Sequence, residues 1–251
     1  MTSDLDLPIG DVLSEGYSRA VDRTAELERL LSRARERKPL LVFGPEGVGK
    51  TRLFHEFVRL QPLALYTQQT KSPHDFLLSL AETLRTKLGA RSLPSNTSAM
   101  STSGIKGTVD RALNTKPFLL LVDHLQGPSR VVTKIVKDLG YYGRTPIFLG
   151  ARSPHMEDIG GLQALCYDKK ERLEMMNWPS EIALEFARRE AERVDLRAGN
   201  LEAALQSIAH LSSGNPGSIL GMLKMASRSQ YRVDEQIKFH VLYLDYRMGR
   251  R

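Results

Sequence analysis

The chain has 251 residues, 41% apolar and 26% charged, a composition typical of a globular protein with a sizeable core, and no apolar stretch is long enough to cross a bilayer. The one cysteine, Cys166, excludes an internal disulfide framework and a multi-cysteine metal site, and the acidic start MTSDLDLPIG lacks the features of a secretory signal, so we expect cytoplasmic localisation. A net charge of +7 and a pI near 9.5 favour an anionic partner such as nucleic acid, although solvated helix faces explain most individual basic clusters.

Apolar periodicity places the first elements along the chain. The sequence predicts, in order, a helix over 24–36, a buried strand over 40–43, a glycine turn, a helix from Lys50 to about Leu60, a strand over 63–66 and a helix through 76–84. Thr24 and Ser72 are the candidate N-caps, because a hydroxyl before an apolar-periodic segment can accept a free backbone N–H.

The middle of the chain continues the alternation of strands and helices. Residues 89–104, GARSLPSNTSAMSTSG, are poor in large apolar side chains and predict a flexible surface loop. Further strands are expected over 118–122 and 146–149, with a weaker one over 171–177. Unbroken apolar strands separated by helical segments predict a parallel sheet covered by helices on both faces.

After Trp178-Pro179 the pattern becomes entirely helical. Helices are expected from Ser180, over 201–211 and after Pro216. Residues 234–248 alternate as a strand would but are equally compatible with a helix, and that choice stays open. From Lys224 onward there are seven Lys/Arg against three Asp/Glu, so the end of the chain is basic.

The glycine turn carries the most specific motif. Residues 44–51, GPEGVGKT, fit the pattern G-x-x-x-x-G-K-[ST] between an apolar strand and a helix. Glycines let successive N–H groups point inward at phosphate oxygens, and the following helix adds the positive end of its dipole. Lys50 would contact the outer phosphates and Thr51 would ligate magnesium, whereas the alternative is a simple tight turn.

A second acidic group is expected on a neighbouring strand. Residues 119–123, LLLVD, end in Asp123 where ligands of open α/β sheets bind, at the carboxyl end of a strand. The sequence therefore predicts a metal-linked role for Asp123, the alternative being an ordinary turn residue.

Together these segments resemble the P-loop ATPases of the AAA+ and STAND (signal-transduction ATPase) type. Residues 21–27, VDRTAEL, are similar to the R-x-x-E-L box before the P-loop; 44–51 and 118–123 resemble Walker A and Walker B; and 214–219, GNPGSI, resemble the G-N-P-x-x-I segment of the helical lid. The resemblance spans about residues 17–227. It implies an α/β fold in which a P-loop NTPase parallel sheet is sandwiched by helices and followed by a small helical lid domain.

The resemblance also implies ligands, boundaries and residue roles. ATP and Mg²⁺ are the expected ligands, with Thr51 and Asp123 on the metal. The expected domains are an N-terminal tail (1–16), a nucleotide-binding core (17–178), a helical lid (179–227) and a basic C-terminal tail (228–251). The expected catalytic residues are Lys50, Asp123 and His124; the expected nucleotide contacts are Gly44, Pro45, Glu46, Gly47, Val48, Gly49, Lys50, Thr51, Arg52, Arg23 and Pro216.

Departures from the family pattern bear on turnover. His124 stands where the family places a water-orienting acid, and it is either a hydrolytic helper or a packing residue. Gly217 stands where many members place the sensor 2 arginine. Ser153 is a candidate for sensor 1 or a loop serine, and Arg144 and Arg152 are candidate arginine fingers or ordinary surface residues. We therefore expect ATP hydrolysis that is slow unless a partner or an oligomer completes the site.

Three functions compete. The first is a regulator that assembles on double-stranded DNA as a homo-oligomer and recruits a protein partner, resembling the ATP-binding subunits of transposition systems and origin-recognition ATPases. Tyr141, Tyr142, Tyr231, Tyr243 and Tyr246 would then stack on bases or pack internally. The second is a STAND-like signalling or defence switch that acts through protein partners. The third, a small-molecule kinase or GTPase, is disfavoured because the sequence lacks an N-K-x-D guanine motif and because its helical C-terminal module resembles a lid rather than an acceptor site.

Overall fold

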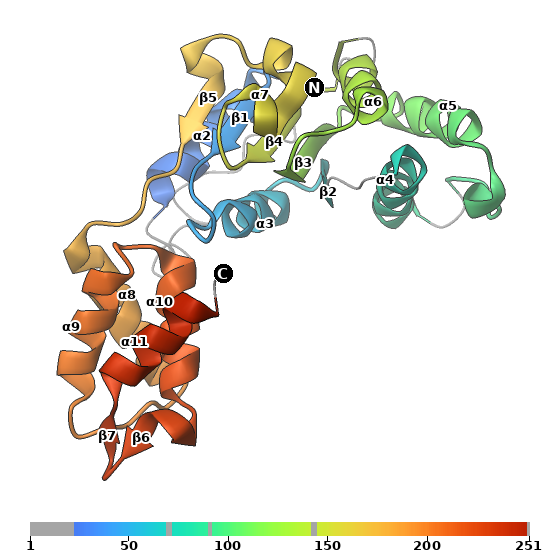
Figure 1. Ribbon diagram of the computed structural model, residues 1–251. Helices are drawn as coiled ribbons and strands as arrows, with labels where there is room; N and C mark the ends of the chain where they lie inside the picture. The colour runs from blue at the N-terminus through green and yellow to red at the C-terminus, as the bar shows by residue number, and fades with distance from the viewer. Residues whose placement is uncertain (1–22, 69–71, 90–91, 142–144, 250–251) are drawn as a thin grey trace. The chain divides into compact units, whose positions relative to one another are not determined.

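The computed structural model describes residues 23–68, 72–89, 92–141 and 145–249 (Figure 1). The expected N-terminal tail, Val21, Asp22, Tyr142 and Arg144 lie outside these residues. Contacts divide the chain into two compact units, one comprising the residues up to Gly44 and Lys50–Met175, the other Pro45–Gly49 and Met176–Arg251. Among the described residues, none of the helices combines the length and the apolar character needed to span a membrane.

The first unit is built on a five-stranded parallel sheet in the order β2-β3-β4-β1-β5. Its strands are β1 (Leu40–Phe43), β2 (Ala64–Gln68), β3 (Leu119–Leu125), β4 (Ile147–Ala151) and β5 (Arg172–Glu174). All strand predictions are matched in place: β1 agrees at both ends, and the other four strands have shifted ends. The ends of β3 and β5 are shifted most: β5 stops at Glu174, and β3 continues past Asp123, with an irregularity in its pairing with β4 between Val122 and Leu125.

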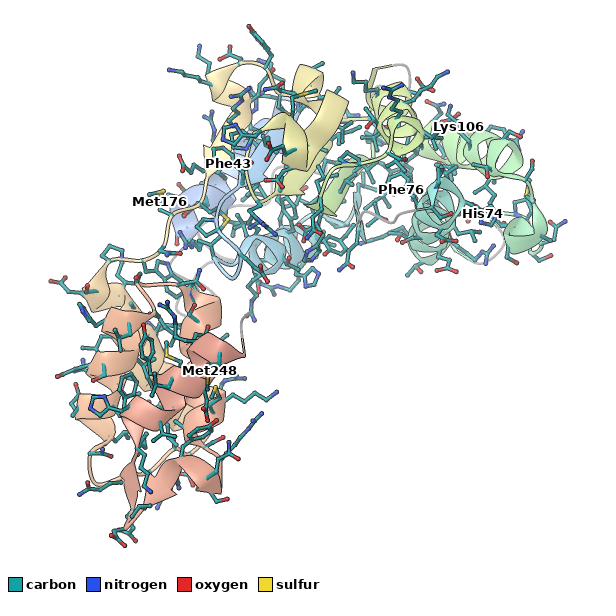
Figure 2. The ribbon with its side chains drawn as sticks, viewed as in Figure 1. Phe43, His74, Phe76, Lys106, Met176 and Met248 are labelled. Atoms are coloured by element: carbon teal, nitrogen blue, oxygen red, sulfur yellow. The ribbon has the colours of Figure 1, made fainter. Side chains whose placement is uncertain are left out.

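Helices cover both faces of this sheet. The helices are α2 (Thr24–Arg35), α3 (Lys50–Leu60), α4 (Pro73–Leu88), α5 (Thr102–Leu113), α6 (Arg130–Tyr141) and the short α7 (Met156–Ile159). Phe76 of α4 is fully buried in a core cluster that α4, α5 and α6 share with one set of alternate strand residues (Figure 2). On the other face, the ring of Phe57 on α3 lies 5.4 Å from that of Phe148 on β4. The predicted parallel sheet between helical layers is confirmed.

The stretch predicted to be a flexible loop is partly helical, so that prediction was wrong. A 3₁₀ turn spans Thr97–Ala99, and α5 begins at Thr102. The side chains of Leu93 and Thr97 are buried, and Ser101 caps α5 by accepting the N–H of Gly104. Serine and threonine are abundant here because they cap and turn the chain, which composition alone does not distinguish from a solvated loop.

The two predicted N-caps have different outcomes. Ser72 accepts the N–H of Asp75 at 3.3 Å, and Pro73 occupies the first turn of α4, as predicted. Thr24 is already the first helical residue, and Arg23 occupies the N-cap position without a capping side-chain hydrogen bond. Helix α2 therefore begins one residue earlier than it would if the Thr24 hydroxyl were its N-cap.

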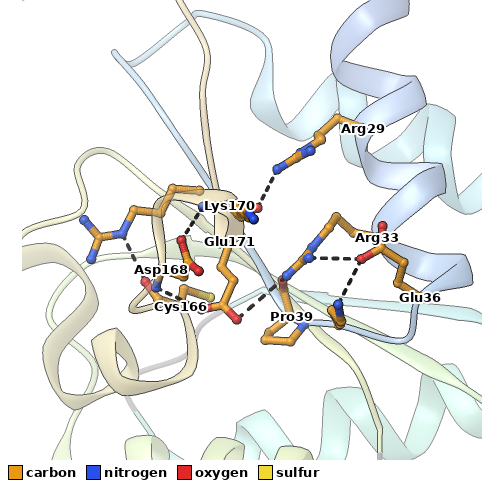
Figure 3. Close-up of polar contacts among 10 residues, drawn as sticks. Arg29, Arg33, Glu36, Pro39, Cys166, Asp168, Lys170 and Glu171 are labelled. Atoms are coloured by element: carbon orange, nitrogen blue, oxygen red, sulfur yellow. Dashed lines mark hydrogen bonds and ion pairs between the residues drawn. The ribbon is translucent and has the colours of Figure 1, made fainter.

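A polar cluster joins α2 to the edge strand β5 (Figure 3). The buried guanidinium of Arg33 donates to the carbonyl of Pro39 and pairs with Glu36 and Glu171. Arg29 donates to the carbonyl of Lys170, in the 3₁₀ turn Lys169–Glu171 that precedes β5. Arg33 thus has a structural role in this unit and is not part of a solvated basic face.

The second unit is helical. It contains α8 (Ser180–Arg193), α9 (Leu201–Leu211), α10 (Pro216–Ala226), the short paired strands β6 (Arg232–Val233) and β7 (Gln236–Ile237), and α11 (Phe239–Met248). The open choice at 234–248 is settled as a hairpin followed by a helix. The buried Tyr231 donates its hydroxyl to Asp245 of α11 at 2.9 Å, so this tyrosine packs inside the unit. Met248, labelled in Figure 2, is exposed at the end of α11.

Candidate functional site

The turn after β1 requires glycine at its first position. A Cβ on Gly44 would lie 2.3 Å from the carbonyl oxygen of Met175, closer than real side chains approach. The backbone of Met175 in turn donates to the carbonyl of Phe43 at 2.7 Å. The backbone at Gly44 therefore lies directly against the backbone of Met175, which follows β5. Only glycine fits at position 44.

Two polar side chains begin α3. The ammonium of Lys50 donates to the carbonyl oxygen of Gly44 at 2.7 Å. The hydroxyl of Thr51 donates to Oδ2 of Asp123 at 2.6 Å. The structure thus brings Asp123 into contact with Thr51, next to Lys50, although 72 residues separate Thr51 from Asp123 in the sequence.

The carboxylate of Asp123 is buried and held on several sides. The Asp123 side chain is 1% exposed, its Oδ1 accepts the N–H of His124 at 2.8 Å, and its Oδ2 also accepts the hydroxyl of Tyr66 at 3.1 Å. A Cβ on Gly150 of β4 would lie 2.3 Å from Oδ1, so glycine makes the space for the carboxylate. The sequence analysis missed Tyr66 and Gly150. A glycine inside an apolar strand is a signal of close approach, and it could have identified Gly150.

His124 lies beside these groups because of the irregularity in β3. Its backbone adopts a left-handed φ of +57°, and its side chain is 51% exposed. Its Nε2 lies 3.2 Å from the hydroxyl of Thr51 and 3.5 Å from Oδ2 of Asp123. Of the two expectations for His124, the structure excludes core packing and places the imidazole next to the proposed metal-binding oxygens.

Two oxygen-bearing side chains of a kind that suits magnesium lie together in this unit. Mg²⁺ is commonly held by one or two protein oxygens together with substrate phosphates and water. The Thr51 hydroxyl and the Asp123 carboxylate are two such oxygens in hydrogen-bond contact. Within the described residues there is no group of three or more His, Cys, Asp or Glu that could hold a metal without a nucleotide. The donor set fits a nucleotide-bound magnesium ion.

Other predicted site residues have structural partners elsewhere. Arg52 pairs with Glu56 along the exposed side of α3, and Arg23 is buried against Glu26. Ser153 donates its hydroxyl to Asp158 at 2.6 Å and accepts the N–H of His155, which is the pattern of a loop serine. The side chain of Arg152 is exposed. The contacts of Arg52 and Ser153 are thus with residues of their own helix or loop.

In the second unit, residues of the glycine turn contact the start of α10. Pro216 is the first residue of α10, and the N–H of Gly217 donates to the carbonyl of Gly47 at 2.9 Å. Asn215 caps α10 by accepting the N–H of Ser218, and it donates to the carbonyl of Glu46 at 2.9 Å. A Cβ on Gly217 would lie 2.8 Å from the Cα of Gly47. The position where the family often places an arginine thus holds a close backbone contact.

Solved structures share this architecture. The chain is similar to Orc1 of Aeropyrum pernix in complex with DNA, at 17% identity and a TM-score of 0.62 over 95% of this chain and 68% of that one. A Walker-type ATPase of Pyrococcus abyssi matches at 17% identity and a TM-score of 0.64 over 91% and 71%. The fold is that of the AAA+ P-loop ATPases.

A third solved structure, of a signal-transduction ATPase, is also similar in fold. A STAND protein of Pyrococcus horikoshii with a tetratricopeptide repeat sensor matches at 15% identity and a TM-score of 0.53, over 91% of this chain and 32% of that one. No protein-family model matches the sequence, and no curated protein does. At these identities the likeness shows the AAA+ fold alone. It confirms the predicted α/β sheet between helical layers.

Proposed function

We propose that the chain binds ATP with magnesium and hydrolyses it slowly. The observation that carries this proposal is the 2.6 Å hydrogen bond between Thr51 and Asp123, directly after Lys50, at the carboxyl edge of an AAA+ sheet. In the proposed complex the amides of residues 44–51 wrap the phosphates and Lys50 neutralises their outer oxygens.

Each residue of the proposed site would have a separate role. Thr51 and Asp123 would hold the metal, and Gly47 and Gly49 would supply N–H donors. Magnesium, when bound, neutralises charge on the transferring phosphate. Slow turnover is expected because the usual acid after the Walker B aspartate is replaced by His124, and because Gly217 provides no sensor arginine.

We further propose that the ATP-bound chain acts on double-stranded DNA, as a homo-oligomer that recruits a protein partner. The support is the net charge of +7 and the similarity to Orc1, which was solved in complex with DNA. The test is ATP turnover with and without duplex DNA, together with particle size in a non-hydrolysable ATP analogue. Stimulation by DNA with growth into larger particles is expected, and affinity should fall steeply with salt because phosphate contacts release counterions.

A STAND-like switch is the second candidate. It is favoured by the similarity to the Pyrococcus horikoshii STAND protein and by the close contact between Gly217 and Gly47, which leaves no arginine at the start of α10. In this function ATP would change the exposure of a protein-binding surface. Particles that stay monomeric with the ATP analogue, and turnover that is indifferent to DNA, would favour the switch over the DNA-associated regulator.

A further inference from the structure

Two polar side chains at the end of β2 lie next to the proposed site, and the proposed function gives them no role. In the parallel register, Tyr66 pairs with Leu121 and Gln68 pairs with Asp123 (Figure 1 shows β2 beside β3). Because side chains alternate along a strand, Tyr66 and Gln68 share one face of the sheet. The ring of His55 on α3 lies 4.8 Å from the Tyr66 ring, so this is the face covered by α3.

Hydrogen bonds connect these side chains to the Walker B aspartate. The carboxamide Nε2 of Gln68 donates to the Tyr66 hydroxyl at 3.2 Å, and that hydroxyl donates to Oδ2 of Asp123 at 3.1 Å. The exposed Gln68 is thereby anchored through its amide nitrogen. Its Oε1 accepts no hydrogen bond from the residues that the structure describes.

His124 belongs to the same cluster and lies against Thr51. Its Nε2 is 3.2 Å from the Thr51 hydroxyl, which is a proposed magnesium ligand. In phosphoryl transfer the attacking water approaches opposite the leaving oxygen, and one residue orients it. The His124 imidazole, which lies against the proposed metal-binding hydroxyl of Thr51, is poorly placed to orient this water. Gln68, in contrast, has a carboxamide oxygen, Oε1, that can accept a hydrogen bond from the water beside Asp123.

We propose that Gln68 orients the attacking water, with Tyr66 as the residue that positions its carboxamide. This inference rests on the proposed ATPase function. The oxygen of water forms a bond to the γ-phosphorus as the bond from that phosphorus to the β–γ bridging oxygen breaks. ADP leaves with the electron pair, and the proton of the water passes to phosphate. Gln68 Oε1 accepts a hydrogen bond from the water and is itself unchanged.

Gln68→Met tests the role of the carboxamide. Methionine keeps the length of the side chain but has no acceptor oxygen. The matched control is Gln206→Met, on an exposed glutamine of α9 whose Nε2 donates to Glu202. Three quantities are measured for each variant and for His124→Ala: the Kd for Mg-ATP, the single-turnover hydrolysis rate, and the trapping of Mg-ADP by aluminium fluoride, which mimics the phosphoryl group with its nucleophile in place.

The expected result separates binding from chemistry. Gln68→Met should lower the single-turnover rate by about 10- to 100-fold and reduce aluminium fluoride trapping, while the Kd for Mg-ATP stays within about twofold of wild type. His124→Ala should lower the rate less than Gln68→Met, and Gln206→Met should match wild type. A Gln68→Met protein that hydrolyses and traps like wild type would overturn the inference. So would a wild-type protein that binds Mg-ATP without hydrolysing it, although the binding function would stand. Absence of Mg-ATP binding would contradict the proposed function itself.

Tyr66→Phe tests the positioning role. Removing the hydroxyl should lower the rate by less than Gln68→Met does, because the carboxamide loses its anchor but keeps its oxygen. The double variant Tyr66→Phe/Gln68→Met should be no slower than Gln68→Met alone, since residues that act through one group are not additive. Losses that multiply in the double variant would show that Tyr66 acts independently of Gln68.

Discussion

At the scale of single residues, the Asp123 carboxylate occupies space that is available only because residue 150 is a glycine. A Cβ at position 150 would meet Oδ1 of Asp123 at 2.3 Å and Cε2 of Phe54 at 2.7 Å. Gly150→Ala should therefore destabilise the first unit by ~1–3 kcal/mol and weaken nucleotide binding as the carboxylate is displaced. Urea unfolding followed by circular dichroism measures the first effect.

Gly107→Ala is the matched control for Gly150→Ala. Gly107 lies within α5, and a Cβ there meets nothing within 4 Å. Alanine in a helix interior is favoured over glycine by roughly 0.5–1 kcal/mol, so this variant should be at least as stable as wild type. Equal stability of the two variants would show that the space beside Asp123 is not constrained.

The single cysteine allows a second test at this scale. Burial, with a smaller contribution from the Glu171 carboxylate, raises the pKa of the Cys166 thiol to about 12. The thiolate is the reactive form, so the folded protein should react with Ellman's reagent at pH 8 at least ~100-fold more slowly than the protein in urea. Because the chain has one cysteine, the absorbance change reports Cys166 alone. Equal rates with and without urea would contradict the buried position.

The residues that the sequence identified are those whose chemistry follows from local order. Lys50 and Thr51 begin α3, Asp123 lies near the carboxyl end of β3, and the carboxyl ends of parallel strands share one edge. Tyr66 and Gly150 contact Asp123 from strands on its two sides. Their contact depends on the lateral order β2-β3-β4, which the order of elements along the chain does not determine.

At the scale of elements, the start of α10 depends on Asn215. Its buried Oδ1 accepts both the N–H and the hydroxyl of Ser218, and its Nδ2 donates to the carbonyl of Glu46 and to Asn177. Asn215→Ala should destabilise the helical unit by ~2 kcal/mol or more, because a cap alone contributes ~1 kcal/mol and two further partners are left unpaired.

Ser72→Ala is the comparison for Asn215→Ala, since Ser72 caps α4 through one hydrogen bond to the N–H of Asp75. It should cost ~1 kcal/mol or less. Urea midpoints of the two variants measure the difference, and hydrogen exchange should show faster exchange at residues 45–49 in Asn215→Ala alone. Equal losses would mean that the additional partners of Asn215 contribute nothing to stability.

Elements with strong periodicity were predicted well, and those specified by tertiary contacts were not. The ends of α3 and α9 agree with the sequence because an apolar face and a clear start define each. Helix α5 was missed because Gly104 and Gly107 weaken its local preference, while burial of Ile105 and Val109 in the core stabilises it. The irregularity that turns His124 toward Thr51 arises from pairing with β4, which no local pattern encodes.

At the scale of the whole molecule, positive charge is less concentrated than the sequence suggests. Arg33 is buried against Glu36 and Glu171, and Arg188 and Arg189 are paired with Glu202 and Glu185. These pairs leave the net charge of +7 unchanged, so the proposed DNA affinity rests on long-range attraction and on arginines elsewhere in the chain.

The central claim is that residues 44–51 bind the phosphates of ATP together with magnesium. Titration of the chain with a fluorescent ATP analogue, with and without Mg²⁺, tests it most directly in wild type, in Lys50→Ala and in Lys116→Ala, whose lysine is exposed outside the site. We predict magnesium-dependent binding by wild type and Lys116→Ala, and a loss of at least ~10-fold in affinity for Lys50→Ala, equivalent to ~1.4 kcal/mol. Undiminished binding by Lys50→Ala, or no binding by wild type, would contradict the account.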